Sequence, residues 1–160
     1  MKICVLLPGK IKPTVLASAE AEYAQRLARW GVEVRIYRDA RVDAKNPETT
    51  RKEEALRIEK LLKPNDFLIA CDERGTPIQT PKLATFLQQA SAGGGVFSGR
   101  QRLVILIGGA VGLDESIRKR ADAVWSLSSL VMAGGVARIV LLEGLYRAMT
   151  LLRGHPYHNA

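Results

Sequence analysis

The fold of this chain is decided at residues 103–112, which read LVILIGGAVG. The apolar run predicts a buried strand, and the glycines directly after it predict a tight turn. Glycine lets the backbone come close to a ligand, and the free N–H groups at the start of the next helix can hold a polar or anionic group. We therefore expect a small-molecule site at the end of this strand.

The rest of the chain alternates strand and helix patterns. Strands are expected at 2–7, 32–37, 66–71, 103–107 and 123–127, and helices at 14–30, 46–62, 80–90, from about 114, and at 136–152. This alternation predicts an α/β fold with a parallel sheet and helices on both faces, in which ligands bind at the carboxyl ends of the strands. With 160 residues that are 47% hydrophobic, we expect a single domain over 1–160.

Three segments carry separate expectations. Residues 72–75, DERG, are expected to form a turn after the third strand, and the glycine-rich segment 91–99 a flexible loop that could border a site. The last helix, 136–152, is apolar nearly all round, so both of its sides should be buried. Since we expect it to be an edge helix with only one sheet to lie on, we infer that its second side meets another subunit.

Composition limits the class of protein. The 24 Lys and Arg residues against 16 Asp and Glu give a net charge of +8, which favours a polyanionic partner without naming one. No stretch reaches the length of a membrane span and no leader peptide is recognisable, so we expect a cytoplasmic protein that binds no membrane. The two cysteines, Cys4 and Cys71, lie in apolar runs and should be reduced and buried.

Several motifs together resemble the ribosomal large-subunit RNA methyltransferase H family, which is a SPOUT-class family. The motifs that carry the resemblance are Gly9-Lys10-Ile11-Lys12, Glu22-Tyr23, Arg26-Leu27, 72–75, Gly108-Gly109, Gly112-Leu113, 125–128, Arg138, 143–148 and His155-Pro156-Tyr157-His158. They span essentially the whole chain. The glycine turn and the terminal motif are specific as a pair, whereas each alone is a weak signal.

The resemblance implies a fold, a reaction and a site. It implies a SPOUT-type sheet with a C-terminal trefoil knot, a homodimer, and transfer of a methyl group from S-adenosylmethionine to N3 of a pseudouridine in helix 69 of 23S rRNA. The cofactor-binding residues would be Cys71, Gly108, Leu127, Ser128, Ser129, Leu130, Val131 and Met132. The catalytic residues would be Arg147, Tyr157 and His158, with the C-terminal tail, residues 155–160, closing over the cofactor of the partner subunit.

One stretch departs from the family pattern. Family members commonly carry a proline, a histidine and a further residue after the cofactor loop, where this chain has Ala133-Gly134-Gly135. We expect this loop to be more mobile, because paired glycines lose more conformational entropy on ordering.

Other interpretations of these motifs remain open. The turn Gly108-Gly109-x-x-Gly112 lacks the G-x-G-x-x-G spacing of a dinucleotide fingerprint, which disfavours dinucleotide binding. The same residues could also form a plain tight turn that binds no ligand. His155 and His158 could suggest a metal pair, but no third ligand lies near them in sequence, so we expect no metal. The tail could also be disordered. The chief alternative function is a non-catalytic RNA-binding or ribosome-binding protein that has kept the fold, and a nucleotide-binding enzyme is a third.

Overall fold

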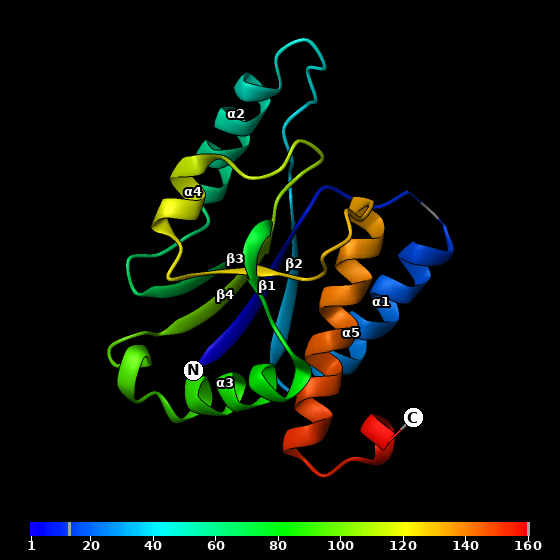
Figure 1. Ribbon diagram of the computed structural model, residues 1–160, viewed down its shortest axis with the longest axis vertical. Coiled ribbons are helices and arrows are strands. Elements are labelled where there is room, and N and C mark those ends of the chain that lie inside the picture. The colour runs from blue at the N-terminus through cyan, green and yellow to red at the C-terminus, as the bar shows by residue number, and fades with distance from the viewer. Residues whose placement is uncertain (13, 160) are drawn as a thin grey trace.

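The computed structural model describes residues 1–12 and 14–159, apart from the side chains of His158 and Asn159, as an α/β fold built on a parallel sheet (Figure 1). The strands are β1 (Lys2–Pro8), β2 (Val32–Tyr37), β3 (Asp66–Pro77), β4 (Arg102–Ile107) and β5 (Ala123–Ser126). The helices are α1 (Val15–Ala28), α2 (Pro47–Glu59), α3 (Thr80–Ala92), α4 (Glu115–Arg120) and α5 (Gly134–Leu152), with two 3-10 turns, η1 (Gly95–Phe97) and η2 (Pro156–Asn159).

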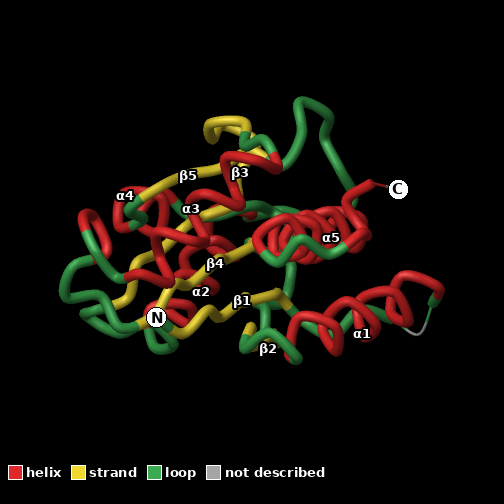
Figure 2. The backbone as a smooth tube through the Cα atoms, turned by 90° about the horizontal axis from the view of Figure 1, so that it is seen from below, coloured by secondary structure: helices red, strands yellow, loops and turns green. Residues whose placement is uncertain are grey.

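The five strands lie in the order β2-β1-β4-β3-β5, and every neighbouring pair is parallel (Figure 2). β4 is central, pairing Leu103 with Ile3 on one side and with Phe67 on the other. The carboxyl ends of the strands therefore meet at one edge of the sheet, where the glycine turn after β4 also lies. The predicted parallel sheet with helices on both faces is confirmed.

Two hydrophobic clusters cover the two faces of the sheet. α1, α3 and α5 pack on one face, with Leu27, Leu87 and Leu142 among the buried side chains. α2 and α4 cover the other face through Ile58 and Ile117. Asn46 caps the start of α2, because its side chain accepts a hydrogen bond from the Thr49 amide. No helix in the described ranges is long and apolar enough to cross a membrane.

The turn predicted at 72–75 is wrong, because β3 continues to Pro77. Cys71 and Thr76 both pair with Trp125 of β5, so residues 72–75 form an excursion within the strand before pairing resumes. A side chain at Gly75 would overlap the backbone of Trp125. Glycine is needed here for the close approach of two strands, which local turn preferences cannot reveal.

The prediction that 91–99 is a flexible loop is also partly wrong. Ser91 and Ala92 complete α3, Gly93 ends it in the left-handed conformation, and Phe97 of η1 is buried against Phe67 and Phe86. This segment lies at the amino-terminal side of β4 and lines no part of the cavity at the carboxyl ends of the strands.

The predicted position of α5 at the edge of the fold is wrong, so its apolar sides do not require a second subunit. α5 is not an edge helix, since α1 and α3 flank it and bury several of its sides within one chain, with Leu145 only 1% exposed. Two valines at the start of the helix, Val136 and Val140, remain exposed. This outer strip, and Leu152 at the far end of the helix, are the exposed apolar positions of α5.

Candidate functional site

A cavity of about 780 Å³ opens at the carboxyl edge of the sheet. The end of β3, the turn after β4, the segment after β5 and the start of α5 form its walls. Its volume falls within the usual range for a site that encloses a small molecule. The predicted location of a small-molecule site after β4 is thus matched by a hollow of suitable size.

The turn after β4 is fixed from behind by a buried acid. The Glu54 carboxylate accepts a hydrogen bond from the Gly109 amide at 2.6 Å, and the Tyr37 hydroxyl lies 3.1 Å from Glu54 and 3.0 Å from the Ile107 carbonyl oxygen. A side chain at Gly109 would overlap this carboxylate, and one at Gly108 would overlap Leu113. Both glycines are required because other groups occupy the space of a Cβ.

The sequence analysis did not single out Glu54. A usable signal was present, because Thr50, Glu54 and Ile58 follow one another at intervals of four residues and all three are buried. An acid that continues the apolar stripe of a helix is a candidate for a buried role.

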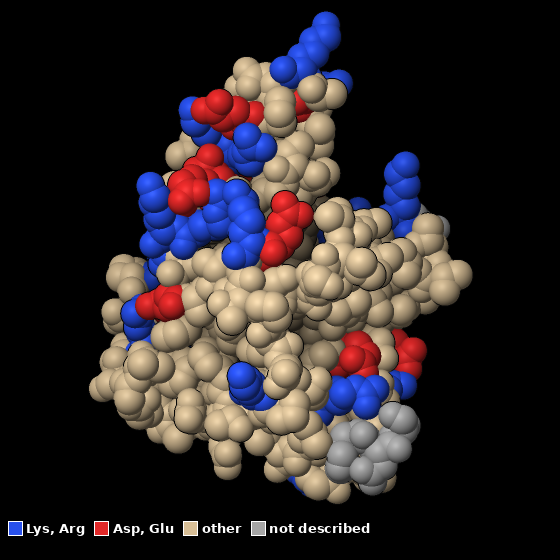
Figure 3. Space-filling view, viewed as in Figure 1, with Lys and Arg blue, Asp and Glu red and all other residues tan. Residues whose placement is uncertain are grey.

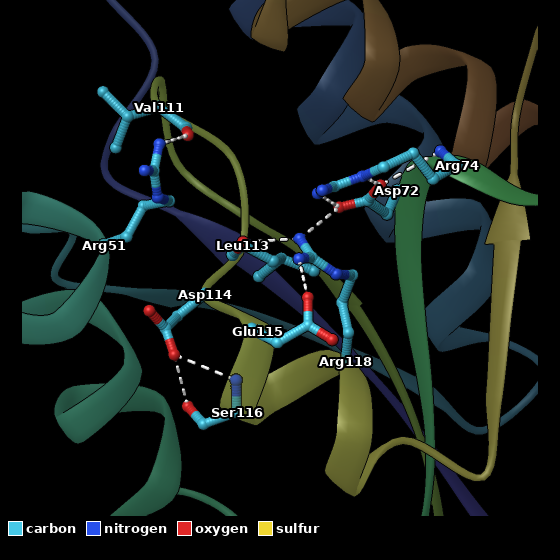
Figure 4. A network of polar contacts seen from close by, with 9 residues as sticks. All are labelled: Arg51, Asp72, Arg74, Val111, Leu113, Asp114, Glu115, Ser116 and Arg118. Atoms are coloured by element: carbon cyan, nitrogen blue, oxygen red, sulfur yellow. Dashed lines mark hydrogen bonds and ion pairs between the residues drawn. The ribbon is translucent and has the colours of Figure 1, made fainter. Parts of the chain in front are cut away.

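A second polar network forms the wall of the cavity between β3 and α4 (Figure 4). Arg74 holds the Asp72 carboxylate through two hydrogen bonds of 2.8 and 2.9 Å, and Arg118 approaches the same carboxylate to 3.3 Å. Arg118 also pairs with Glu115. Hydrogen bonds from Arg74 lower the pKa of Asp72 to about 2, against an opposing effect of burial. Asp72 is therefore an anion at neutral pH.

The predicted cofactor residues gather around this cavity. Cys71, Gly108, Leu127, Ser128, Leu130, Val131 and Met132 all line it, whereas Ser129 is not among the lining residues. Both cysteines are free thiols and buried, as predicted. Burial raises the pKa of the Cys71 thiol to about 12, so this sulfur is an uncharged apolar contact at neutral pH rather than a nucleophile.

The segment that departs from the family pattern lies partly in α5 rather than in a loop. Gly134 and Gly135 form the first turn of the helix. Gly134 lines the cavity and has open space where a side chain would begin, whereas a side chain at Gly135 would press on Ile11 and Leu16 at 3.1 Å. The expected mobile loop at 133–135 is therefore wrong for Gly134 and Gly135, which are helical, and stays a prediction only for the residues before them.

The predicted catalytic residues are not brought to the cavity within one chain. Arg147 lies thirteen positions after Gly134 in α5, or about 20 Å along the axis, and Tyr157 follows the far end of the helix (Figure 1). Arg147 pairs with Glu143 at 2.8 Å and lies over the Tyr157 ring, whose hydroxyl is 3.1 Å from that of Tyr23. The side chain of His158 falls outside what the structure describes.

Tyr157 is held in an ordered position rather than in a disordered tail. Its ring contacts Tyr146 edge to face, with centroids 4.7 Å apart. Burial, and then the hydrogen bond with Tyr23, raise the pKa of the Tyr157 hydroxyl, so it keeps its proton at neutral pH. Within the described residues no group of three or more His, Cys, Asp or Glu side chains is arranged to hold a metal ion.

The cavity is acidic although the chain is basic. The charged side chains that line it are the carboxylates of Glu48, Asp72, Glu73, Asp114 and Glu115 and the guanidinium groups of Arg51, Arg74 and Arg118. Five acids against three bases give the lining two net negative charges in a chain of net charge +8. Figure 3 shows acidic and basic side chains interleaved over α4. Such a lining favours a cationic ligand beside its apolar wall.

The model of a protein family described as predicted SPOUT methyltransferase matches residues 1–158. The chain therefore belongs to the SPOUT methyltransferase family.

Its curated relatives carry the name ribosomal RNA large subunit methyltransferase H. The protein of Methylobacillus flagellatus is 39% identical over 161 residues, covering 99% of each chain. Those of Nitrosococcus oceani and Syntrophotalea carbinolica are 38% and 36% identical and cover at least 99% of this chain and 99% of their own. The family resemblance inferred from the motifs is confirmed.

Proposed function

We propose that this protein is an S-adenosylmethionine-dependent methyltransferase that acts on N3 of a pseudouridine in helix 69 of 23S rRNA. The observation that carries the proposal is the acidic, partly apolar cavity at the carboxyl edge of the sheet, lined by most of the residues expected to bind the cofactor. Family membership and the names of the relatives support the reaction and the class of substrate.

The residues around the cavity fit the cofactor. S-adenosylmethionine carries a net positive charge, and when bound it supplies an electrophilic methyl group on sulfur. The acidic lining would stabilise that charge, and Leu127, Leu130 and Met132 would contact the adenine. The backbone of Gly108 would pass close to the ligand, because no side chain separates them.

A homodimer would complete the site. Since the tail lies at the far end of α5 from the cavity, Tyr157 of one subunit can reach a cavity only in a second copy. An apolar patch at the start of α1 and α5 supports such an interface, and its members are Val15, Leu16, Leu130, Val131, Val136 and Val140. The side chain of Leu16 lies beside Gly135, which brings the two helix starts together.

The tail would supply the groups that act on the base. The N3 of pseudouridine is a poor nucleophile while protonated, so the site must remove the proton and stabilise the anion. The Arg147 guanidinium would stabilise the anion, and the protonated Tyr157 hydroxyl would donate a hydrogen bond to a neighbouring base oxygen. We assign proton removal to His158, and alignment of the reacting atoms would supply much of the remaining rate.

A basic edge beside the cavity would bind the RNA backbone. Lys10 and Lys12 follow β1, and the basic loop, residues 38–45, follows β2, all at the same edge of the sheet as the cavity. Arg41 and Lys45 of this loop are exposed, and basic side chains project from the molecule near the start of α2 (Figure 3). Hydrogen bonds from the Asp43 amide to the Thr50 hydroxyl and from Arg57 to the Asp39 carbonyl hold the backbone of the loop in place.

Three further features belong to the proposal. We infer a C-terminal trefoil knot, supported by family membership and by the way the segments after β4 and β5 line one cavity. We infer one domain over residues 1–160, supported by matches that span the chain. Because the proposed substrate is ribosomal RNA, we infer that the protein is located in the cytoplasm.

The competing function is a non-catalytic RNA-binding or ribosome-binding protein. The observation that favours it is Gly134, which leaves open space in the cavity wall where the family commonly has a histidine. Calorimetric titration of the folded protein with S-adenosylmethionine separates the two. We expect saturable binding, and absence of binding at millimolar cofactor by protein that still binds ribosomes would replace the first function with the second.

A further inference from the structure

Glu54 is the one buried carboxylate among the described residues that does not face an arginine. Its exposed fraction is 3%. Other buried carboxylates are paired, since Glu20 lies 3.0 Å from Arg138 and Asp66 lies 2.6 Å from Arg102. The Asp72 carboxylate is held by Arg74 at 2.8 Å. The hydrogen-bond donors that reach Glu54 are the neutral groups Gly109 N–H, Tyr37 O–H and, at 3.5 Å, Ala40 N–H.

Burying a carboxylate without a counterion is costly, and neutral hydrogen bonds offset that cost only in part. A buried carboxyl group without a basic partner therefore calls for a function. Glu54 lies directly behind Gly109, which lines the cavity, so one peptide unit separates the carboxylate from the ligand space. Across that distance, and away from bulk water, the field of the carboxylate acts on a ligand with little screening.

We propose that Glu54 is a specificity-determining residue that makes the cavity bind a cationic sulfonium cofactor more tightly than its neutral thioether product. The proposal rests on the proposed function, because it assumes that S-adenosylmethionine enters this cavity and that S-adenosylhomocysteine leaves it. The two ligands differ by the methyl group and its positive charge. A fixed negative charge behind the turn therefore stabilises the substrate form and favours release of the product.

Tyr37 positions the carboxylate. Its hydroxyl, also buried, lies within hydrogen-bond distance of both Glu54 and the Ile107 carbonyl oxygen, so its single proton is shared between two acceptors and holds the acid near the end of β4. Burial and the nearby Glu54 both raise the pKa of the Tyr37 hydroxyl, so it remains a hydrogen-bond donor at neutral pH. Tyr37 carries no charge of its own and should not contribute to discrimination by charge.

The test compares the binding of three ligands to wild-type protein and variants by calorimetry at one ionic strength. The ligands are S-adenosylmethionine, S-adenosylhomocysteine and sinefungin, in which an amine-bearing carbon replaces the sulfonium. In Glu54→Gln the amide oxygen can take the place of the one carboxylate oxygen that accepts from both Gly109 and Tyr37, so the charge is removed with little change in shape. Tyr37→Phe removes the hydroxyl and keeps the charge, and Asp66→Asn breaks a buried ion pair at the opposite edge of the sheet.

We expect Glu54→Gln to weaken binding of the two cationic ligands by about tenfold and to change binding of the thioether by less than about threefold. Tyr37→Phe should weaken all three ligands alike, and Asp66→Asn should lower the melting temperature without changing the ratio of affinities. Equal weakening of all ligands in Glu54→Gln would overturn the proposal, since Glu54 would then only hold the turn, and unchanged affinities would overturn it too.

If Glu54→Gln does not fold, the affinities of the three ligands for wild-type protein still test the proposal. Sinefungin and S-adenosylmethionine should both bind several-fold more tightly than S-adenosylhomocysteine, and equal or tighter binding of the thioether contradicts the proposal. A wild-type protein that binds none of the three ligands refutes the proposed function instead, so the two failures are distinguishable.

Discussion

Arg118 of α4 reaches across to Asp72 of β3, with 3.3 Å between the guanidinium nitrogen and the carboxylate oxygen. The same guanidinium nitrogen donates to the Leu113 carbonyl at 2.8 Å, so one side chain connects the strand, the turn and the helix that form one wall of the cavity (Figure 4). Asp72 is the centre of this connection, and its side chain is only 4% exposed.

The ionisation of Asp72 should make stability depend on pH. Its pKa is lowered to about 2 in the folded chain from an ordinary value of 3.8. The stabilisation is therefore fully present above about pH 4 and is lost as the pH falls through about 2. We expect Asp72→Asn to lower the free energy of unfolding by about 2 kcal/mol at pH 7, as measured by denaturant titration.

The difference between wild type and Asp72→Asn should shrink as the pH falls from about 4 toward about 2. Glu73→Gln is the matched control, because it removes an exposed carboxylate from the neighbouring position. A difference that stays constant from neutral pH down to this acidic range would show that the destabilisation comes from packing and not from the charge of Asp72.

Val140, rather than a residue in the middle of α5, is the position that tests the dimer. Leu145 is 1% exposed within a single chain, so Leu145→Glu would unfold the subunit and say nothing about association. Val140 is 37% exposed on the outer strip of α5. We expect Val140→Glu to leave the melting temperature nearly unchanged and to weaken dimerisation by roughly 10- to 100-fold in sedimentation experiments, because the new charge would be buried at the interface.

Leu56→Glu on α2 provides the comparison, since Leu56 is exposed on the other face of the molecule. It should leave association unchanged. A wild-type protein that sediments as a monomer at micromolar concentration would reject the interface altogether.

A mixed dimer should recover activity that neither parent has. Gly134→Trp fills the cavity from a position with open space, and deletion of residues 155–160 removes the tail. If each site combines a cavity from one subunit with the tail of the other, random exchange of subunits should restore about a quarter of wild-type methyl transfer. Mixtures that remain inactive, although mass spectrometry shows mixed dimers, would mean that each chain builds its own site.

RNA affinity should depend on the basic loop. Replacing Arg41 and Lys45 by alanine should weaken binding of a 23S rRNA fragment and reduce the slope of log affinity against log salt by about one unit for each phosphate that is no longer neutralised. Lys60 and Lys82 lie away from the cavity, and their double alanine variant is the control. Equal effects of the two double variants would indicate attraction by net charge alone.

The strands and helix starts could be predicted because their causes are local. Apolar runs such as 103–107 have to be buried, and Asn46 and Asp114 cap the helices that follow them. The extension of β3 past Cys71 could not be predicted, since it depends on Gly75 packing against a strand fifty residues away.

Only those residues of the candidate site that belong to recognisable motifs could be predicted from the sequence. The residues expected to bind the cofactor were predicted from the family resemblance, and most of them line the cavity. Glu54 was missed because charge alternation along α2 hides which acid turns inward. The length of α5 was readable from the sequence. The orientation of α5 comes from its packing between α1 and α3, which sequence patterns do not reveal. This packing places the start of the helix at the cavity and its end, with Tyr157, away from Gly108.

The most direct test of the account is mass spectrometry of the helix 69 fragment of 23S rRNA. Ribosomes from a strain that lacks this gene would be incubated with the purified protein and S-adenosylmethionine, with the tail-deleted protein in parallel. We expect the wild-type protein to add one methyl group to a pseudouridine of this fragment, at N3, and the truncated protein to add none. A fragment that stays unmethylated, with protein that binds both cofactor and ribosomes, would contradict the proposed reaction.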